Sequence, residues 1–205
     1  MSRNPHIRWE SFINQTKDKP ANRLLQRASA MIMKDAQPHK DLHAFDVGCG
    51  AGRDMFFLLN SGFDVTAIDR CEQAIDAVSE RYTPNDVTAL TLLHADMNTL
   101  HIPKNHLTNA HHAIPFCSPN NIENVMYALL DAVYSGGYFC ATFFGEYDSW
   151  KEDKHIATLT ELQLKQFFHH HWTVKYFENV TPFEGKTATG KVKTWHILSI
   201  IAKKI

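Results

Sequence analysis

Net charge is almost absent from this chain. Its 205 residues include 21 Lys and Arg against 22 Asp and Glu, a formal net charge of −1 at pH 7. Binding to a polyanion needs a basic surface field, which this balance does not supply. We therefore expect no nucleic-acid partner. The 13 histidines make the net charge positive only as the pH falls through roughly 6.5.

Cysteine and long apolar runs are also scarce. The cysteines have neither the paired spacing of a zinc ribbon nor the density of a secreted disulfide scaffold. They are Cys49, Cys71, Cys117 and Cys140. No stretch of about eighteen apolar residues could span a bilayer, and the first residues lack the apolar core of a signal peptide. We expect a cytoplasmic protein without membrane contact.

Repeats, low-complexity tracts and Gly/Ser/Pro-rich linkers are missing too, so we interpret residues 1–205 as a single domain. What is present is an alternation of β-type and helix-type patterns. Strands are predicted within 43–50, 63–70, 87–96, 107–116, 138–145, 172–180 and 193–202. Helices are predicted within 21–36, 53–62, 72–82, 122–134 and 160–170. This order indicates an α/β fold: a mostly parallel sheet with helices on both faces, closed by an antiparallel hairpin.

Two of these helices have possible capping boxes, Asn120 with Glu123 and Thr160 with Gln163. Glycines 136 and 137 are expected to stop the helix over 122–134.

The stretch "FDVGCGAGRD" places Gly48, Gly50 and Gly52 between the first strand and its helix. Glycine there permits a tight turn and close approach of a ligand to the backbone. A plain turn would need only one glycine, so the spacing favours a binding loop. The dinucleotide fingerprint wants its third glycine one residue later, where this chain has Arg53.

Three acids accompany the loop. Asp69 ends the second strand and could accept hydrogen bonds from ribose hydroxyls, in a dinucleotide or in another adenosine-containing cofactor. Asp96 follows the third strand, as an adenine contact or as a loop cap. Asp46 lies in an apolar strand, where a carboxylate needs a ligand's cation or backbone donors.

These features resemble class I S-adenosylmethionine-dependent methyltransferases. "FDVGCGAGRD" is similar to their first motif, and Asp69 and the acid of "HADM" match the acids after their second and third strands. The resemblance implies a Rossmann-like, seven-stranded sheet whose last strand runs antiparallel. It implies S-adenosyl-L-methionine as the cofactor and methyl transfer as the activity.

The resemblance also implies residue roles. The three glycines border the methionine and ribose parts, and Asp46 helps to hold the methionine amino group. Asp69 binds the ribose, and Asp96 lies by the adenine. The candidate cofactor-binding set is completed by the neighbours of these acids and by the fourth-strand motif: Arg70, Met97 and Asn109.

A narrower resemblance, to small bacterial methyltransferases of the tellurite-resistance type, rests on "SFINQTKDKP", "NAHHAIPFCSP", "FFGEYDSW" and "KTWHILSIIAKK". It implies a small-molecule acceptor, with a metalloid or a thiol as candidates. It also divides the chain into a helical leader or lid, 1–40, and a cofactor-binding core, 41–205. In the fourth-strand motif, Asn109, Ala110 and His111 stand where many class I enzymes have an acid. We expect a monomer or a homodimer.

His111 and His112 are the candidate catalytic bases, near the end of the fourth strand. Because adjacent strand residues face opposite sides, at most one of them is expected to face the pocket. The remaining histidines match no familiar metal-ligand spacing, so no metal is predicted. Two alternatives stay open: an NAD-dependent oxidoreductase and a non-catalytic S-adenosylmethionine-binding module.

Overall fold

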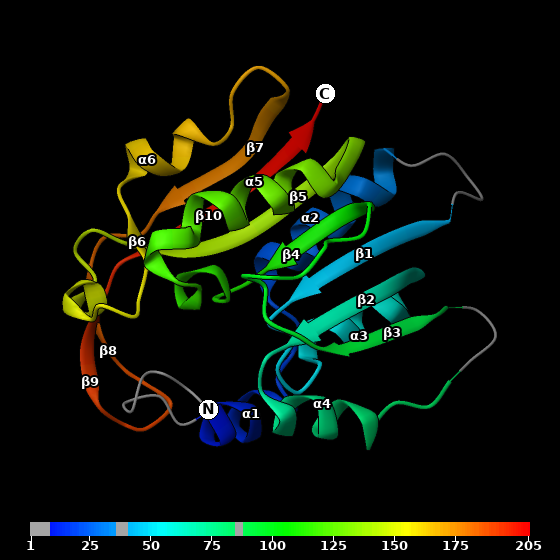
Figure 1. Cartoon of the computed structure of the whole chain (residues 1–205), viewed down its shortest axis with the longest axis horizontal. Coiled ribbons are helices and arrows are strands. Elements are labelled where there is room, and N and C mark those ends of the chain that lie inside the picture. Colours follow the sequence, from blue (N-terminus) through cyan, green and yellow to red (C-terminus); the bar gives the residue numbers. More distant parts are fainter. Residues whose placement is uncertain (1–8, 36–40, 85–87) are drawn as a thin grey trace.

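A computed structural model describes residues 9–35, 41–84 and 88–205. Its centre is a sheet in which seven strands lie in the order β3-β2-β1-β4-β5-β10-β7 (Figure 1). These strands are β1 (Leu42–Val47), β2 (Phe63–Asp69), β3 (Leu90–His94), β4 (Asn105–Ala110), β5 (Val133–Gly145), β7 (Trp172–Asn179) and β10 (Ile197–Lys204). The two-residue β6 (Thr158–Leu159) pairs with β5, and β8 (Phe183–Lys186) with β9 (Val192–Trp195) forms a separate two-stranded sheet.

The sheet is mostly parallel, as the alternating pattern predicts. Strands β1 to β5 pair in parallel, and β10 is antiparallel to both of its neighbours, β5 and β7. The predicted seven-stranded sheet and antiparallel terminal hairpin are therefore confirmed. The short β6 and β8 are additions that the sequence patterns did not predict. The single strand predicted over 193–202 is divided in the structure into β9, which pairs with β8, and β10.

Helices cover both faces of the sheet. They are α1 (Trp9–Thr16), α2 (Arg23–Asp35), α3 (Arg53–Asn60), α4 (Glu72–Ser79), α5 (Ile122–Ala132) and α6 (Glu161–Gln166), with short 3₁₀ turns η1 (Ile114–Phe116), η2 (Pro119–Asn121) and η3 (Ser149–Glu152). Among the described residues, none of the helices is long and apolar enough to cross a membrane.

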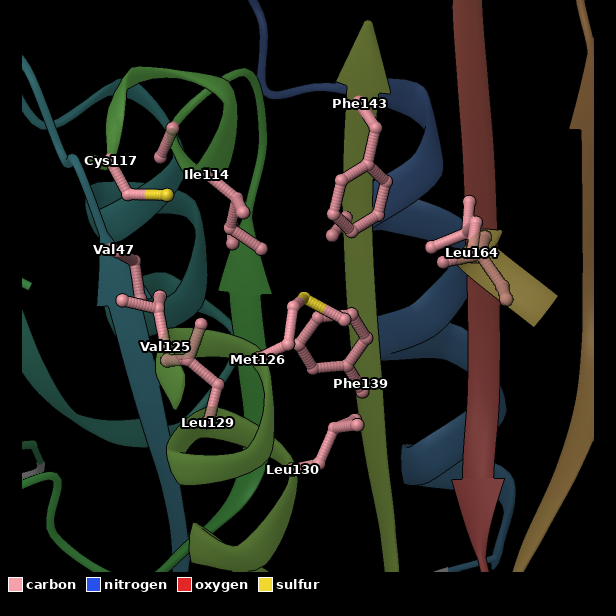
Figure 2. Packing of buried hydrophobic residues seen from close by; sticks show 14 of the residues in the cluster. Val47, Ile114, Cys117, Val125, Met126, Leu129, Leu130, Phe139, Phe143 and Leu164 are labelled. Carbon is pink, nitrogen blue, oxygen red and sulfur yellow. The ribbon is translucent and has the colours of Figure 1, made fainter. Parts of the chain in front are cut away.

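Side chains that alternate along the strands build two apolar clusters, one on each face. Phe45 and Val47 of β1 belong to the cluster that α5 and α6 cover, whereas Ala44 belongs to the cluster that α2 and α3 cover. Figure 2 shows the first cluster, with Met126 and Leu129 of α5 among the strand side chains. Each fully buried side chain of this size stabilises the fold by about 1.5–3 kcal/mol.

The region around α5 differs from the sequence expectation. The helix ends at Ala132, and Gly136 and Gly137 lie inside β5 instead of stopping the helix. A Cβ on Gly137 would lie 2.8 Å from the carbonyl oxygen of His106, so glycine is needed where β5 approaches β4 across a register shift. The predicted Asn120 capping box is wrong, because the cap is Asn121 and its side chain makes no cap bond.

The second capping box is confirmed. Thr160 Oγ1 accepts from the Gln163 N–H at 3.1 Å, and Gln163 Oε1 accepts from the Thr160 N–H at 2.8 Å. The helix that it begins ends at Gln166, before the predicted His170.

The chain reverses its direction of winding between β1 and β4. From β1 it passes through β2 to β3 on one side, and it then returns to β4 on the other side of β1. Ligands of open α/β sheets bind at the carboxyl ends of the strands at such a switch point. Figure 1 shows α1 and the β8–β9 hairpin on the side toward which β1 and β4 point.

Candidate functional site

The glycine loop after β1 has left-handed backbone at all three glycines, with φ of 69° at Gly48, 54° at Gly50 and 82° at Gly52. A Cβ on Gly48 would lie 2.8 Å from the Cβ of Ala113, whereas a Cβ on Gly50 would meet no atom within 4 Å. Gly48 and Gly50 line a cavity. Gly52 instead begins α3, and a Cβ there would crowd the side chain of Phe56 at 2.9 Å.

Asp69, at the carboxyl end of β2, holds this loop. Its Oδ2 accepts from the Gly50 N–H at 2.9 Å, and its Oδ1 accepts from the Cys71 N–H at 2.8 Å. Burial raises the pKa of the Asp69 carboxyl above its ordinary value, while the two backbone donors oppose that rise. Asp69 therefore shapes the loop and also lines the same cavity.

Asp46 is buried behind the loop and does not line the cavity. Its Oδ1 accepts from Asn109 Nδ2 at 2.7 Å, but among the described residues Oδ2 has no hydrogen-bond partner. Burial, and secondarily the charge of Asp54, raise the pKa of Asp46 to about 7. A buried carboxylate with one unpaired oxygen suits a cation such as an ammonium.

Three other cofactor candidates also line the cavity. Arg70, Asp96 and Met97 line the cavity, and the Arg70 guanidinium lies 5.8 Å from the Trp9 ring centre. Asp96 Oδ1 accepts from the Asn98 N–H at 2.9 Å, so it does cap its loop. Gly52 and Asn109 are the predicted cofactor residues that, like Asp46, stay outside the cavity lining.

Helix α1 covers the opening of this cavity. Trp9, Phe12 and Ile13 contribute to its lining, and Trp9 packs edge-on against Phe116 at 4.9 Å between ring centres. The remaining volume is about 60 Å³, whereas small-molecule sites usually measure about 300–1,000 Å³. A cofactor of nucleoside size therefore does not fit the cavity in the observed arrangement of its lining.

Both candidate histidines line the cavity, with ring centres 4.2 Å apart. The expectation that at most one would face it is wrong, because β4 ends at Ala110 and His112 adopts a φ of 51°. The strand alternation therefore no longer applies. Burial lowers the pKa of His111 to about 3 and that of His112 well below its usual range, so both rings are neutral at pH 7.

Hydrogen bonds determine where each ring carries its proton. Asn22 Oδ1 accepts from the Leu24 N–H, so Asn22 Nδ2 donates to His111 Nε2 at 2.7 Å. The proton of His111 is then on Nδ1, which donates to Thr142 Oγ1 at 3.2 Å. The Thr142 hydroxyl donates in turn to His112 Nδ1 at 3.2 Å. No ring nitrogen of either histidine keeps a free lone pair.

A second cavity, of about 280 Å³, adjoins the first. The two share four lining residues, which are Trp9, Phe12, His112 and Phe116. Phe144, Trp150 and Trp195 line only the second. Phe116, Phe144 and Trp150 are among the aromatic residues that follow the fourth and fifth strands in the sequence, whereas Tyr147 is 61% exposed and lies outside both cavities.

Sequence reasoning missed the ion pair behind this aromatic wall. Lys193 of β9 pairs with Asp148, and both side chains are buried. Its ammonium lies 3.9 Å from the ring centres of both Trp150 and Trp195, and Asp148 also accepts from the Trp150 N–H at 2.9 Å. Burial lowers the pKa of Lys193, and the Asp148 carboxylate opposes that effect. The two residues are 45 positions apart, so no local pattern reveals the pair.

This combination of a glycine loop, an acid after β2 and an antiparallel last strand defines the fold of class I S-adenosylmethionine-dependent methyltransferases. A family model, tellurite resistance protein TehB, matches residues 18–196. The chain belongs to this TehB family. Helix α1 precedes the matched region. No curated protein matches the chain in a sequence comparison.

Solved structures show the same fold. TehB from Haemophilus influenzae is 18% identical with a TM-score of 0.68, and the match covers 86% of this chain and 62% of that chain. An S-adenosylmethionine-dependent methyltransferase from Methanosarcina mazei is 18% identical with a TM-score of 0.61, covering 85% and 97%. Magnesium protoporphyrin IX methyltransferase from Synechocystis, with bound S-adenosylhomocysteine, is 10% identical with a TM-score of 0.66, covering 96% and 94%. This chain spans 62% of the length of the H. influenzae chain.

Within the described parts of the chain, no group of three His, Cys, Asp or Glu side chains is placed to hold a metal ion.

Proposed function

We propose that this protein is an S-adenosylmethionine-dependent methyltransferase that acts on a small molecule, with a thiol or a metalloid as the acceptor. The main observation is that a Cβ on Gly50 would meet no atom within 4 Å. Gly50 belongs to the loop that Asp69 holds, and it lines a cavity that adjoins a second one. The first cavity would hold the methyl donor once α1 moves outward, and the second cavity would hold the acceptor.

The bound cofactor would supply a methyl group already activated by its sulfonium charge. The protein then needs to hold donor and acceptor in line more than it needs a strong acid or base. Asp69 would accept from the ribose hydroxyls, and the unpaired Oδ2 of Asp46 would face the ammonium of the methionine part. Asp96 and Met97 would border the adenine.

The histidines fit a positioning role better than a base. Their lone pairs are engaged in the chain that runs from Asn22 through Thr142, and burial opposes the charge that proton uptake would create. An acceptor that arrives ionised needs no base. This favours thiolates and reduced metalloid species over alcohols and ammonium ions.

Helix α1 is proposed to be the movable part of the lid. It contacts the loop after β8 through Gln15, whose Nε2 donates to the carbonyl oxygen of Ala188 at 2.6 Å. Residues 1–8 and 36–40 of the proposed leader lie outside the described residues. We further propose that the single domain works in the cytoplasm as a monomer or homodimer.

Calorimetric titration tests the donor site. We expect saturable binding of S-adenosylmethionine and S-adenosylhomocysteine and no binding of NAD. Gly50→Ala should weaken cofactor binding by about tenfold or more, because its methyl group enters the ligand's space.

Gly62→Ala is the matched control. Gly62 also has a left-handed φ, 88°, and a Cβ added there would meet no atom within 4 Å. Both substitutions incur a similar backbone cost of about 1–2 kcal/mol, but only the first should affect the ligand. Equal cofactor affinities in the two variants would show that the glycine loop does not contact the cofactor. Binding of NAD without binding of S-adenosylmethionine or S-adenosylhomocysteine would overturn the proposed function.

A further inference from the structure

The second cavity has an aromatic lining that the methyl donor does not require. Its wall includes Trp9 from α1, Phe116 from the turn after β4 and Trp195 from β9. Phe144 and Trp150 complete the wall. A volume of about 280 Å³ is at the small end of ligand sites, which usually measure about 300–1,000 Å³. The lining and the size suit a small planar ring.

The wall is held rigidly by the buried pair of Lys193 and Asp148. Besides Lys193, the Asp148 carboxylate accepts from the backbone N–H groups of Trp150 and His196, at 2.9 and 3.1 Å. One carboxylate thus ties β9, η3 and the start of β10 together. Because this pair holds Trp150 and Trp195, which lie outside the movable α1, little of the conformational entropy of these two side chains is lost on binding.

The charges around this cavity favour an anion. Its described lining contains Lys19 and Lys186 but no Asp or Glu. The indole Nε1 of Trp9, in the wall common to both cavities, is buried and has no hydrogen-bond partner among the described residues. The Lys193 ammonium behind the rings of Trp150 and Trp195 is paired with Asp148, so the net positive charge at the cavity comes from Lys19 and Lys186. These two lysines would repel a protonated amine, against the attraction of the ring faces for a cation.

Resting on the proposed function, we propose that this cavity binds a small aromatic thiolate as the methyl acceptor. Ring stacking selects the aromatic part, and the positive surroundings select the ionised sulfur. An aromatic thiol is largely ionised at neutral pH, which matches a site whose histidine lone pairs are engaged. An inorganic oxyanion could contact the lysines but would leave the ring faces without a stacking partner.

The transfer balances without a base. The thiol releases its proton to solvent before it enters the cavity. A lone pair of the thiolate then forms a bond to the methyl carbon, while the bond from that carbon to the sulfonium sulfur breaks and leaves its electron pair on that sulfur. The products are a methyl aryl thioether and S-adenosylhomocysteine.

The first test is turnover of labelled S-adenosylmethionine by wild-type protein with thiophenol, butanethiol, phenol, benzylamine and tellurite. We expect methylation of thiophenol, with kcat/KM at least about tenfold above that of each of the others. Equal or faster turnover of butanethiol or tellurite would overturn the aromatic thiolate. Cofactor binding without turnover of thiophenol would also overturn it, while leaving the donor site of the proposed function intact.

The second test measures binding without chemistry. Three of the four tryptophans line the cavity, and the fourth, Trp172, packs against Phe139 and Phe168 in the core. Thiophenol added with S-adenosylhomocysteine should therefore quench tryptophan fluorescence saturably, and benzylamine should not. An unsaturable or equal response to the two would contradict a site with this charge and shape.

Two variants locate the binding. Phe12→Ala should weaken thiophenol binding about fivefold, because one aromatic contact is lost. Ala188→Leu, which adds bulk to the loop that lines only the second cavity, should weaken it similarly and leave cofactor affinity unchanged. Tyr127→Ala is the control, since Tyr127 is an exposed aromatic residue of α5 outside both cavities. Unchanged thiophenol affinity in both cavity variants would place the acceptor elsewhere.

Discussion

The free energy of unfolding of the wild-type protein should fall as the pH rises, because of Asp46. Replacing Asp46 by Asn should abolish this pH dependence. Asp46 is buried, with one carboxylate oxygen bonded to Asn109 and the other without a partner among the described residues. An Asn side chain has the same shape and keeps an oxygen to accept from Asn109. It carries no charge at any pH, so the change isolates the cost of the buried charge.

The magnitude follows from the pKa of Asp46. Burial raises it from an ordinary 3.8 to about 7 in the folded protein. At a pH between these two pKa values, Asp46 is ionised in the unfolded chain but still protonated in the folded chain. A rise in pH therefore favours unfolding. The full stability from this group is present below about pH 4 and is lost as the pH rises to about 7. At about 1.36 kcal/mol per pH unit, with a slope that falls to half of this at pH 7, the wild type loses about 2 kcal/mol between pH 5 and pH 7.

Urea denaturation of both proteins at pH 5, 6, 7 and 8, followed by circular dichroism, measures this effect. The free energy of unfolding of Asp46→Asn minus that of the wild type should grow by about 2 kcal/mol from pH 5 to pH 7 and then level off. The contributions of the other titrating groups are the same in both proteins and cancel in this difference of unfolding free energies. Parallel curves for the two proteins would refute the reasoning that the buried carboxylate is protonated below neutral pH.

Cofactor binding provides a second comparison for the same variant. An ammonium beside Asp46 would lower its pKa, so the wild type should release a proton on binding S-adenosylmethionine at pH 6, and Asp46→Asn should not. Calorimetry in two buffers of different ionisation enthalpy measures this release. Equal proton release by both proteins would exclude Asp46 as the ammonium contact while leaving the stability argument unaffected.

Three further substitutions test the loop and the aromatic wall. Asp69→Asn places an amide donor against the N–H of Gly50 or Cys71 and should weaken cofactor binding by about 1–3 kcal/mol in calorimetry. Gly145→Ala would put its Cβ 2.1 Å from Nδ1 of His196 and should lower the free energy of unfolding by about 1–3 kcal/mol or more in urea. Lys193→Met leaves the buried charge of its partner uncompensated and should destabilise the fold by about 3–5 kcal/mol in the same assay.

Each of these results has a control. Gly136→Ala shares the glycine-to-alanine change at a position where a Cβ would meet no atom within 4 Å. Lys165→Met breaks the exposed pair with Glu161, which should cost about 1 kcal/mol or less. If Lys193→Met cost no more than Lys165→Met, the buried pair would not hold the wall. An Asp69→Asn variant with normal cofactor affinity would limit Asp69 to shaping the loop.

Much of the fold follows from local patterns. Short β-type runs alternate with amphipathic helices, and such an order folds into a parallel sheet with covered faces. The Thr160–Gln163 box forms because both of its bonds lie within one turn. The α5 boundary was missed because Gly137 serves a close approach to β4, a contact between strands that helix-stop rules do not describe.

The sequence by itself determined the glycine-loop side of the candidate site. Gly48, Gly50 and Asp69 reach one place because the carboxyl ends of adjacent parallel strands meet at one edge of the sheet. Only the tertiary structure decided the side formed by the histidines and the aromatic wall. Both histidines face the cavity because the chain leaves β4 in a left-handed turn, and Lys193 meets Asp148 across 45 residues. Such contacts depend on how distant segments pack, so the spacing of residues along one segment does not predict them.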